Sequence, residues 1–140
     1  MSPAPTTRPL RDLGWAVSIV AMLGMFWTVV EPRPETRQNE RHLEARVLLL
    51  LDRYEHPDGV SIELPRIEVA DWDGAGVATA SCSDWRIRVR PGAVSSLPDG
   101  ALDELLAHEL AHLLVCAEEG RRAAHDTEWW RMYRRIYTIG

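Results

Sequence analysis

The sequence predicts a small α+β domain that follows an N-terminal hydrophobic helix. Residues 13–30 carry no charged side chain, which is typical of a membrane-spanning segment. Later in the chain, apolar residues recur at helical spacing before and after three short segments that alternate as strands do. The length of 140 residues suits one compact domain and is short for two.

The composition narrows the function classes. With 46% hydrophobic and 26% charged residues, the chain fits a globular protein and not a disordered or multi-span membrane protein. Its 16 basic residues, all arginine, and 21 acidic residues give a net charge of −5, which argues against a general nucleic-acid binder. Two cysteines, Cys82 and Cys116, are too few for a disulfide framework or a four-thiolate zinc site, and whether they pair is left open.

The hydrophobic run at residues 13–30 is predicted to anchor the chain in a membrane as a single-pass helix. At about 1.5 Å per residue it is roughly 27 Å long, close to a hydrocarbon layer of about 30 Å. Large residues at its C-terminal end argue against cleavage as a signal peptide, and its apolar character on all sides argues against the alternative of a buried domain helix. Trp15 and Trp27 lie near its two ends, as interfacial anchors do.

The side of the membrane on which the rest of the chain lies is left open. Four arginines closely follow the run and two precede it, which favours a cytoplasmic C-terminal part. A short arginine-bearing leader before an uncleaved apolar run is also typical of a signal anchor, which exports that part. The chain is thus divided into a tail (1–12), an anchor (13–30), a linker (31–34) and one domain (35–140).

The domain is predicted to begin with a helix at residues 35–55 and to continue with a three-stranded antiparallel meander at 66–72, 77–82 and 85–90. The helix has one apolar stripe and ends at a Pro-Asp-Gly turn. Glycine-rich and Ser-Asp turns separate the strands, which favours hairpins between neighbours. In the third strand the arginines Arg86, Arg88 and Arg90 face away from the core, as a solvated face or a contact for an acidic partner.

Two more helices are predicted in the last third of the chain. A loop framed by Pro-Gly and Pro-Asp-Gly leads to a helix at residues 100–119, with Asp99 as its cap and Gly120 at its end. The last helix is expected at residues 126–138.

The helix at residues 100–119 carries a candidate metal site. Every residue from 105 to 117 is apolar except His108, Glu109 and His112, so this helix must be largely buried, and its polar groups need partners. Residues four apart lie roughly 40° apart around a helix axis and about 6 Å along it, so both imidazoles can bind one ion. Glu109 then lies beside that ion, which is the arrangement of a zinc site with a general base. The alternative is a pair of core histidines bonded to backbone or to Glu109.

A catalytic zinc ion needs a third protein ligand and one open position. Glu118 and Glu119 follow on the same helix, but they lie too far along it or on another side. His125 opens the last helix after Gly120 can turn the chain, and it is the predicted third ligand; Asp126 is either its orienting partner or the helix cap. The remaining histidines, His42 and His56, receive no role.

The residues His108-Glu109-Leu110-Ala111-His112, followed by a helix that begins at His125-Asp126, resemble the SprT-like zinc metallopeptidases. The resemblance covers about residues 35–139 and is specific in the last third of the chain. It implies a minimal gluzincin-type, zincin-like fold in which His108, His112 and His125 bind zinc and Glu109 is the general base. It also places Trp129 at the aromatic core position of the last helix. An N-terminal anchor and a gap of twelve residues between His112 and His125 depart from the members that act in DNA repair.

The sequence therefore predicts a membrane-anchored zinc metallopeptidase that hydrolyses a protein or peptide substrate with Glu109 as the base. Tyr133 and Tyr137 are candidates for stabilising the oxyanion, although aromatic residues at helical spacing also suit a core. An exposed edge of the meander could hold the substrate as an added strand. Cys116 is expected to be a small buried hydrophobe and not a ligand.

Two other functions are kept as alternatives. The first is a non-catalytic binding module that zinc staples together, for which a carboxylate beside the open position has no use. The second is a metal-dependent hydrolase of nucleic acids, suggested by arginines in the third strand and the last helix. These arginines are Arg86, Arg88, Arg90, Arg121, Arg122, Arg131, Arg134 and Arg135.

Overall fold

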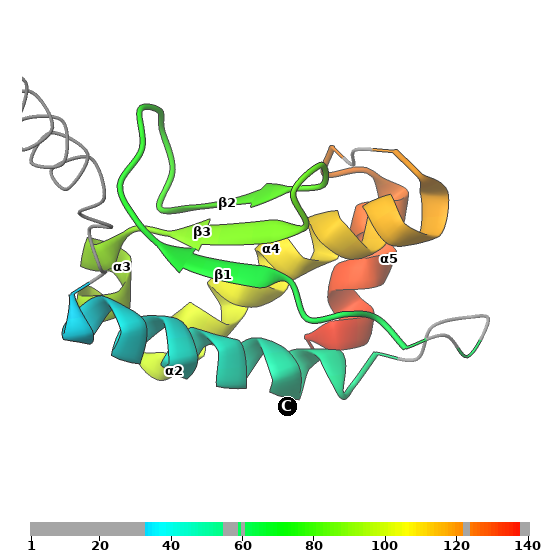
Figure 1. Cartoon of the computed structure of the whole chain (residues 1–140). Helices are drawn as coiled ribbons and strands as arrows, with labels where there is room; N and C mark the ends of the chain where they lie inside the picture. Colours follow the sequence, from blue (N-terminus) through cyan, green and yellow to red (C-terminus); the bar gives the residue numbers. More distant parts are fainter. Residues whose placement is uncertain (1–32, 55–58, 60, 122–123, 138–140) are drawn as a thin grey trace, which may run out of the picture. The chain divides into compact units, whose positions relative to one another are not determined.

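The computed structural model describes residues 33–54, 59, 61–121 and 124–137. Its elements, in chain order, are α2 (Pro34–Leu51), β1 (Arg66–Val69), β2 (Ala78–Ser81), β3 (Arg86–Val89), α3 (Pro91–Ser96), α4 (Asp99–Glu119) and α5 (Thr127–Ile136) (Figure 1). The α+β class predicted from the sequence is thereby confirmed. The predicted anchor at 13–30 lies outside the described residues, and no helix within them has the length and apolar character needed to cross a bilayer.

The sheet is mixed, so the prediction of an antiparallel meander was wrong. Its strand order is β1-β3-β2, with β3 parallel to β1 and antiparallel to β2 (Figure 1). Only the turn between β2 and β3 is a hairpin between neighbours. The segment between β1 and β2 is a wide loop, which leaves room for the third strand to enter between the first two.

Arg90, which directly follows β3, explains why the loop at residues 70–77 stays wide. Its guanidinium donates hydrogen bonds to the carbonyl oxygens of Trp72, Gly74 and Gly76 at 2.7–3.0 Å, and it lies 4.2 Å from the Trp72 ring centroid. Gly74 and Gly76 have positive φ angles of 142° and 95°, which other residues rarely adopt. The loop thus folds around the guanidinium of Arg90. The expectation that Arg90 lies on a freely solvated face was therefore wrong.

Helices α2 and α4 cover one face of the sheet. Helix α2 packs against β1 and α4, and α4 packs against β2 and β3. Ile87 and Val89 of the central strand are fully buried on this face, as the strand alternation predicted. Helix α5 packs against α4 through Trp129, Met132 and Ile136, each at most 2% exposed. The core therefore surrounds α4, the helix that carries the candidate site.

Helix α2 ends earlier than its apolar periodicity predicted, because backbone hydrogen bonds after Leu51 form a tighter turn. Helix α2 ends at Leu51, because the next turn tightens through bonds from Arg53 and Tyr54 to the carbonyls of Leu50 and Leu51. Tyr54 is still buried, at 8% exposure, so the apolar stripe outlasts the helix.

Asp99 does not cap α4. It is the first residue of that helix, Pro98 occupies the capping position, and the Asp99 carboxylate pairs with Arg46 at 3.4 Å. At the other end, Gly120 closes α4 in the left-handed conformation (φ 65°), as predicted. The segment expected to be a loop after β3 contains the short helix α3, which begins with Pro91, a residue whose fixed φ suits a first helical turn.

A disulfide joins Cys82 to Cys116. Cys82 directly follows β2, and Cys116 lies one turn beyond His112 in α4. The bond therefore links the sheet edge to the helix that bears the site. Cys116 packs in a half-buried position, and the question of whether the two cysteines pair, which the sequence left open, is answered by this bond.

Candidate metal centre

Three imidazole rings from two elements meet at one point of the fold. His108 and His112 lie one turn apart on α4, and His125 stands just before α5. The Nε2 atom of His125 is 2.9 Å from that of His108 and 3.2 Å from that of His112. One ligand atom from each histidine lies within 4.8 Å of the others. The structure thus brings together the three residues that the sequence selected as ligands.

His125 reaches this point because the chain reverses after α4 and is then fixed by a cap. The left-handed Gly120 ends the helix, and the side chain of Asp126 accepts a 3.1 Å hydrogen bond from the backbone N–H of Trp129. Arg121 donates to the other Asp126 oxygen at 2.8 Å. Of the two roles considered for Asp126, the structure shows the helix cap.

Trp129 forms an aromatic floor under the three histidines. Its ring centroid lies 4.7 Å from that of His108, 5.5 Å from that of His112 and 4.6 Å from that of His125. The side chain is 2% exposed, which agrees with the core position implied by the resemblance. Because the indole touches all three rings, it restricts their orientations and keeps their Nε2 atoms together.

The donor set fits zinc. In a tetrahedral site with Zn–N distances of about 2.0–2.1 Å, ligand nitrogens lie roughly 3.3 Å apart, close to the two separations found here. Three histidines leave one of four positions open, as catalytic zinc sites do. Burial, and then the neighbouring His125, lower the pKa of His108, which favours the neutral imidazole that a metal requires.

Glu109 lies against the sheet edge with its carboxylate largely removed from solvent. It is 7% exposed, and the backbone N–H of Ala80 in β2 donates a hydrogen bond to it. Burial raises its pKa from the ordinary 4.5 to about 7, although the Ala80 bond acts in the opposite direction. A carboxyl group that titrates near neutrality is well matched to accept and return a proton.

This raised pKa predicts how the metal-free protein responds to pH. The unfolded chain ionises Glu109 near pH 4.5 and the folded chain near pH 7, so ionisation above pH 4.5 favours the unfolded state. We expect Glu109 to lower the free energy of unfolding by about 3 kcal/mol as pH rises from 4.5 to about 8. Denaturant unfolding in the presence of a chelator measures this change.

Glu109→Gln is the matched variant for that experiment. It removes the ionisation and should remove the loss of stability at high pH. His108, whose lowered pKa destabilises the fold as pH falls below 6.5, contributes equally to both proteins. Identical pH profiles for the two proteins would contradict the assignment to Glu109.

The metal centre opens onto a cleft between α4 and the edge strand β2. His108 and Glu109 line a cavity of about 470 Å³ there, together with Val77 and Ala78 from the strand side. In the antiparallel pairing of β2 with β3, Thr79 is bonded to Arg88, so the main-chain groups of Ala78 and Ala80 point to the free edge. The sequence could not identify this edge, because it depends on the strand order.

Other polar residues near the site have partners elsewhere. Glu118 accepts a 2.6 Å hydrogen bond from Tyr54, and Glu119 pairs with Arg121, which agrees with their exclusion as ligands. The hydroxyl of Tyr137 donates to the backbone oxygen of Gly100 at 3.4 Å. Tyr133 stacks on Trp129 with a centroid distance of 5.2 Å, so of the two tyrosines it is the one in contact with the floor of the site.

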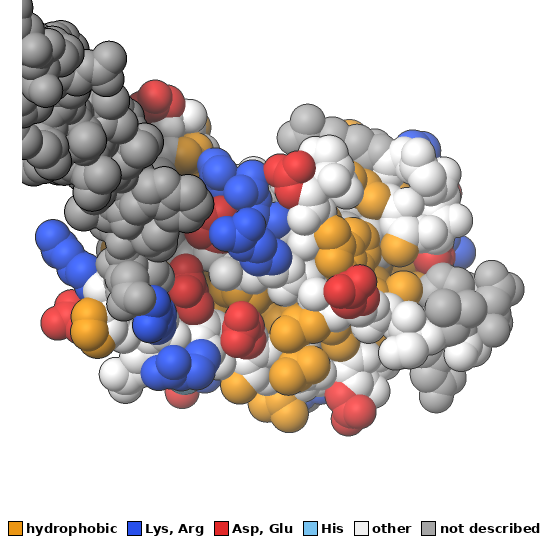
Figure 2. All heavy atoms as spheres, in the orientation of Figure 1, with side chains coloured by type: hydrophobic (Ala, Val, Ile, Leu, Met, Phe, Trp, Pro, Cys, Tyr) orange, Lys and Arg blue, Asp and Glu red, His pale blue; other side chains and the backbone are white. Residues whose placement is uncertain are grey.

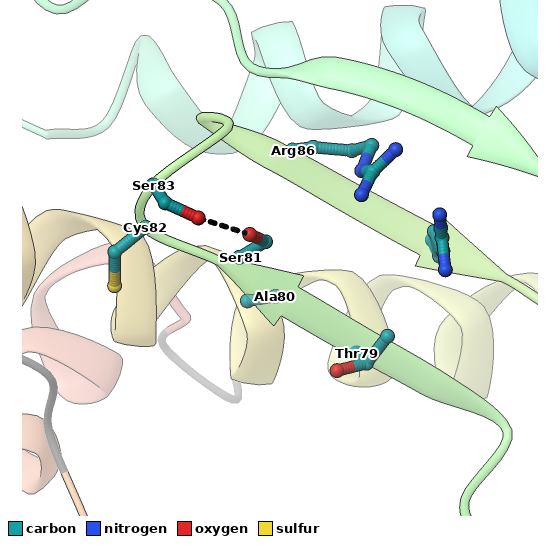
Figure 3. Close-up of a pocket in the computed structure, with 7 residues that line it drawn as sticks. Thr79, Ala80, Ser81, Cys82, Ser83 and Arg86 are labelled. Atoms are coloured by element: carbon teal, nitrogen blue, oxygen red, sulfur yellow. Dashed lines mark hydrogen bonds between the residues drawn. The ribbon is translucent and has the colours of Figure 1, made fainter. Parts of the chain in front are cut away.

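The face of the sheet that points away from the helices carries arginine and acidic side chains that form ion pairs with one another. Glu68 of β1 pairs with both Arg86 and Arg88 of β3, and Asp84 also pairs with Arg86 at 2.8 Å. Figure 2 shows arginine side chains over β1 and β3 with acidic side chains beside them. Figure 3 shows a hollow on this face, where Arg86 lies across from Ser81. These pairs leave Arg86 and Arg88 with little unbalanced charge for phosphate groups, which disfavours a nucleic-acid contact through these two arginines.

Comparisons with known proteins agree with this geometry. The model of the SprT-like family matches residues 52–140. The chain belongs to the SprT-like family. Protein SprT of Pectobacterium carotovorum is 45% identical over 60 residues, which are 42% of this chain and 35% of that protein. Protein SprT of Serratia proteamaculans is 36% identical over 74 residues, 51% of this chain and 44% of that protein. The matched region of this SprT-like chain thus spans 35% and 44% of the length of these two relatives.

A solved structure shares the fold. The metallopeptidase zymogen abylysin of Pyrococcus abyssi superposes with a TM-score of 0.51 at 22% identity, covering 67% of this SprT-like chain and 78% of that one. This likeness supports the zincin-like architecture predicted from the resemblance. The sequence did not reveal two contacts at the site, which are the hydrogen bond from Ala80 to Glu109 and the packing of Trp129 against the three histidines. Both depend on elements that only the tertiary fold brings together.

Proposed function

We propose that this SprT-like protein is a zinc-dependent metallopeptidase that hydrolyses peptide bonds of a protein or peptide substrate. The observation that carries the proposal is the meeting of His108, His112 and His125 beside the buried carboxyl group of Glu109. Bound zinc would supply a Lewis acid that polarises the scissile carbonyl and lowers the pKa of water.

Glu109 acts as the general base and then as the general acid. Its carboxylate accepts a proton from the attacking water and returns it to the leaving amine. The bond from Ala80 fixes one side of the carboxylate, while the cavity that it shares with His108 gives the other side access to substrate. A purely structural zinc site has no need of such a group, which favours the enzyme over the binding module.

The substrate binds as an added strand along β2. The free edge offers the N–H and C=O groups of Ala78 and the C=O of Ala80, and α4 closes the opposite side of the cleft. An extended peptide held there passes over His108 and Glu109. Tyr133 remains the candidate for stabilising the oxyanion, because its ring stacks on Trp129 next to the histidines.

Chelation is the direct test of this function. The full-length chain in detergent micelles, supplied with zinc, should cleave an unfolded protein such as reduced casein, with the new termini identified by mass spectrometry. Chelation with 1,10-phenanthroline should stop cleavage, and added zinc should restore it. Cleavage that persists without metal would contradict the proposal.

We also propose that residues 13–30 anchor the protein in a membrane and that the domain lies outside the reducing cytoplasm. The apolar run supports the anchor, and the Cys82–Cys116 disulfide supports the compartment, because such bonds persist in oxidising environments. We give this argument more weight than the arginine count, which favoured the cytoplasm, because the short arginine-bearing leader before the run is also typical of a signal anchor.

A maleimide reagent tests the compartment. In bacterial cells that express the full-length chain, both thiols should stay unmodified until a reductant is added, and a protease outside the cytoplasmic membrane should digest the domain. The Cys82→Ser/Cys116→Ser variant controls for non-specific labelling. Modification by a membrane-permeant maleimide without reductant, together with protection of the domain from the external protease, would place the domain in the cytoplasm instead.

A further inference from the structure

The cleft beside the metal centre contains one acidic side chain that the proposed chemistry does not use. Glu104 lines the same cavity as His108 and Glu109, together with a largely apolar set of neighbours. These are Gly76, Val77, Ala78, Leu97, Ala101 and Leu105. Apart from the two carboxyl groups and the histidine, the wall is apolar or backbone, so Glu104 determines the charge at its end of the cavity.

Glu104 is exceptional among the six carboxyl groups of α4. The other five are engaged: Asp99 and Asp103 pair with Arg46, Glu109 accepts from Ala80, Glu118 from Tyr54, and Glu119 pairs with Arg121. Within the part of the chain that the structure describes, Glu104 has no ion pair or hydrogen bond with another side chain. Its charge acts on the nearby His108 and Tyr133 without forming such a pair, so the carboxylate can still bind a cationic ligand.

The helix dipole does not account for Glu104 either. Helix α4 begins at Asp99, so Glu104 is already in its second turn. The effect of the dipole falls off within the first turn. The side chain is exposed and lines the cavity, a position from which its carboxylate can contact a ligand bound there.

We propose that this cavity accepts an arginine or lysine side chain of the substrate and that Glu104 determines the preference; the proposal rests on the proposed peptidase function. The aliphatic stem of such a side chain would lie against Val77, Leu97 and Leu105, and its cationic end would pair with Glu104. Val77 is 49% exposed and so offers apolar surface against which such a stem can pack.

The position of Glu104 along α4 allows it to pair with a cationic side chain while a metal ion is bound. Glu104 precedes His108 by four residues, so it lies on the same side of the helix, about 6 Å further from the metal along the axis. A cationic group paired with Glu104 is thus kept away from the positive ion. An acidic side chain would meet Glu104 with repulsion, and a purely apolar one would desolvate its carboxylate without a partner.

Cleavage-site profiling tests the preference. The full-length zinc-loaded protein in detergent is given a synthetic library of random-sequence peptides, and products are sequenced by mass spectrometry. We expect arginine or lysine at one fixed position next to the cleaved bond, enriched roughly tenfold over alanine, which corresponds to about 1.4 kcal/mol. Glu104→Gln should abolish the enrichment, and Glu104→Arg should change it to acidic side chains.

Asp99→Asn is the matched control, because it removes one negative charge from the same helix at a position outside the cavity. It should leave the profile unchanged. Loss of the preference in this variant as well would show a general charge effect and would overturn the role of Glu104. Thermal melting of each variant shows whether the fold is retained, as expected for substitutions at exposed side chains.

A binding readout separates this proposal from the peptidase function. The same library is passed over immobilised Glu109→Gln protein, and retained peptides are sequenced. Retention of basic peptides that Glu104→Gln abolishes supports the pocket even if the wild-type protein cleaves nothing, in which case only the peptidase function fails. Cleavage without a basic preference overturns the pocket alone. If the protein shows no cleavage and no selective retention, both the pocket and the peptidase function are overturned.

Discussion

Glu109→Gln is expected to lower kcat/KM for peptide hydrolysis by about a thousandfold while the zinc content stays at one ion per chain. The amide keeps the shape of the side chain and can still accept the hydrogen bond from Ala80. It cannot accept a proton, and positioned general bases typically contribute a factor of about 10²–10⁴ to the rate. Metal analysis alongside kinetics on the full-length chain measures both quantities.

The matched control is Glu119→Gln, at the exposed end of the same helix. It removes an equal charge and an ion pair with Arg121 but leaves the cleft intact, so its kcat/KM should stay close to the wild-type value. If Glu109→Gln retains full activity, another group must activate water. If it loses zinc as well, the carboxyl group has a structural role that the present assignment does not include.

The site was predictable because it depends on local spacing. Two histidines one turn apart on an apolar helix must face the same side, and Gly120 followed by a second helix brings His125 back towards them. The helix period and a left-handed helix end are properties of short segments, so they can be derived from the sequence. The burial of Glu109 likewise followed from the apolar residues that surround it.

The sheet order was not predictable, because it depends on contacts between distant residues. Alternation fixes which face of a strand is buried, but not which strand is its neighbour. Here the bonds of Arg90 to three carbonyl oxygens of the loop at 70–77 keep that loop wide, and β3 enters between β1 and β2. No signal in the sequence distinguishes Arg90 from Arg86 and Arg88, which instead pair with Glu68.

The same limit explains why the cap was misassigned and why the pairing of the two cysteines was left open. Asp99 has the residue type of a cap, but an ion pair with Arg46, over fifty residues away, takes up its carboxylate. Cys82 and Cys116 are separated by 34 positions, and they meet only because β2 is the strand that lies along α4. Because strand order also decides which edge is free, the cleft and its Glu104 cavity could be described only from the folded chain.

His125→Ala is expected to weaken zinc binding at least about a hundredfold, since loss of a direct ligand should exceed the 10–100-fold typical of outer-shell changes. The other two imidazoles lie on one helix and cannot surround the ion without the ring supplied from the start of α5. Peptide cleavage should disappear at zinc concentrations that saturate the wild-type protein. Competition with a chromogenic chelator measures the affinity of each variant.

Two comparisons separate ligation from helix placement. His42→Ala removes an exposed histidine of α2 and should leave zinc affinity unchanged. Asp126→Ala removes the cap of α5, which typically costs about 1 kcal/mol of stability, and should weaken zinc binding less than His125→Ala because the imidazole is retained. If His125→Ala binds zinc as tightly as the wild-type protein, the rings of His108 and His112 hold the metal with another donor, and the third-ligand assignment fails. Equal losses in the two variants would instead show that α5 acts only by positioning the chain.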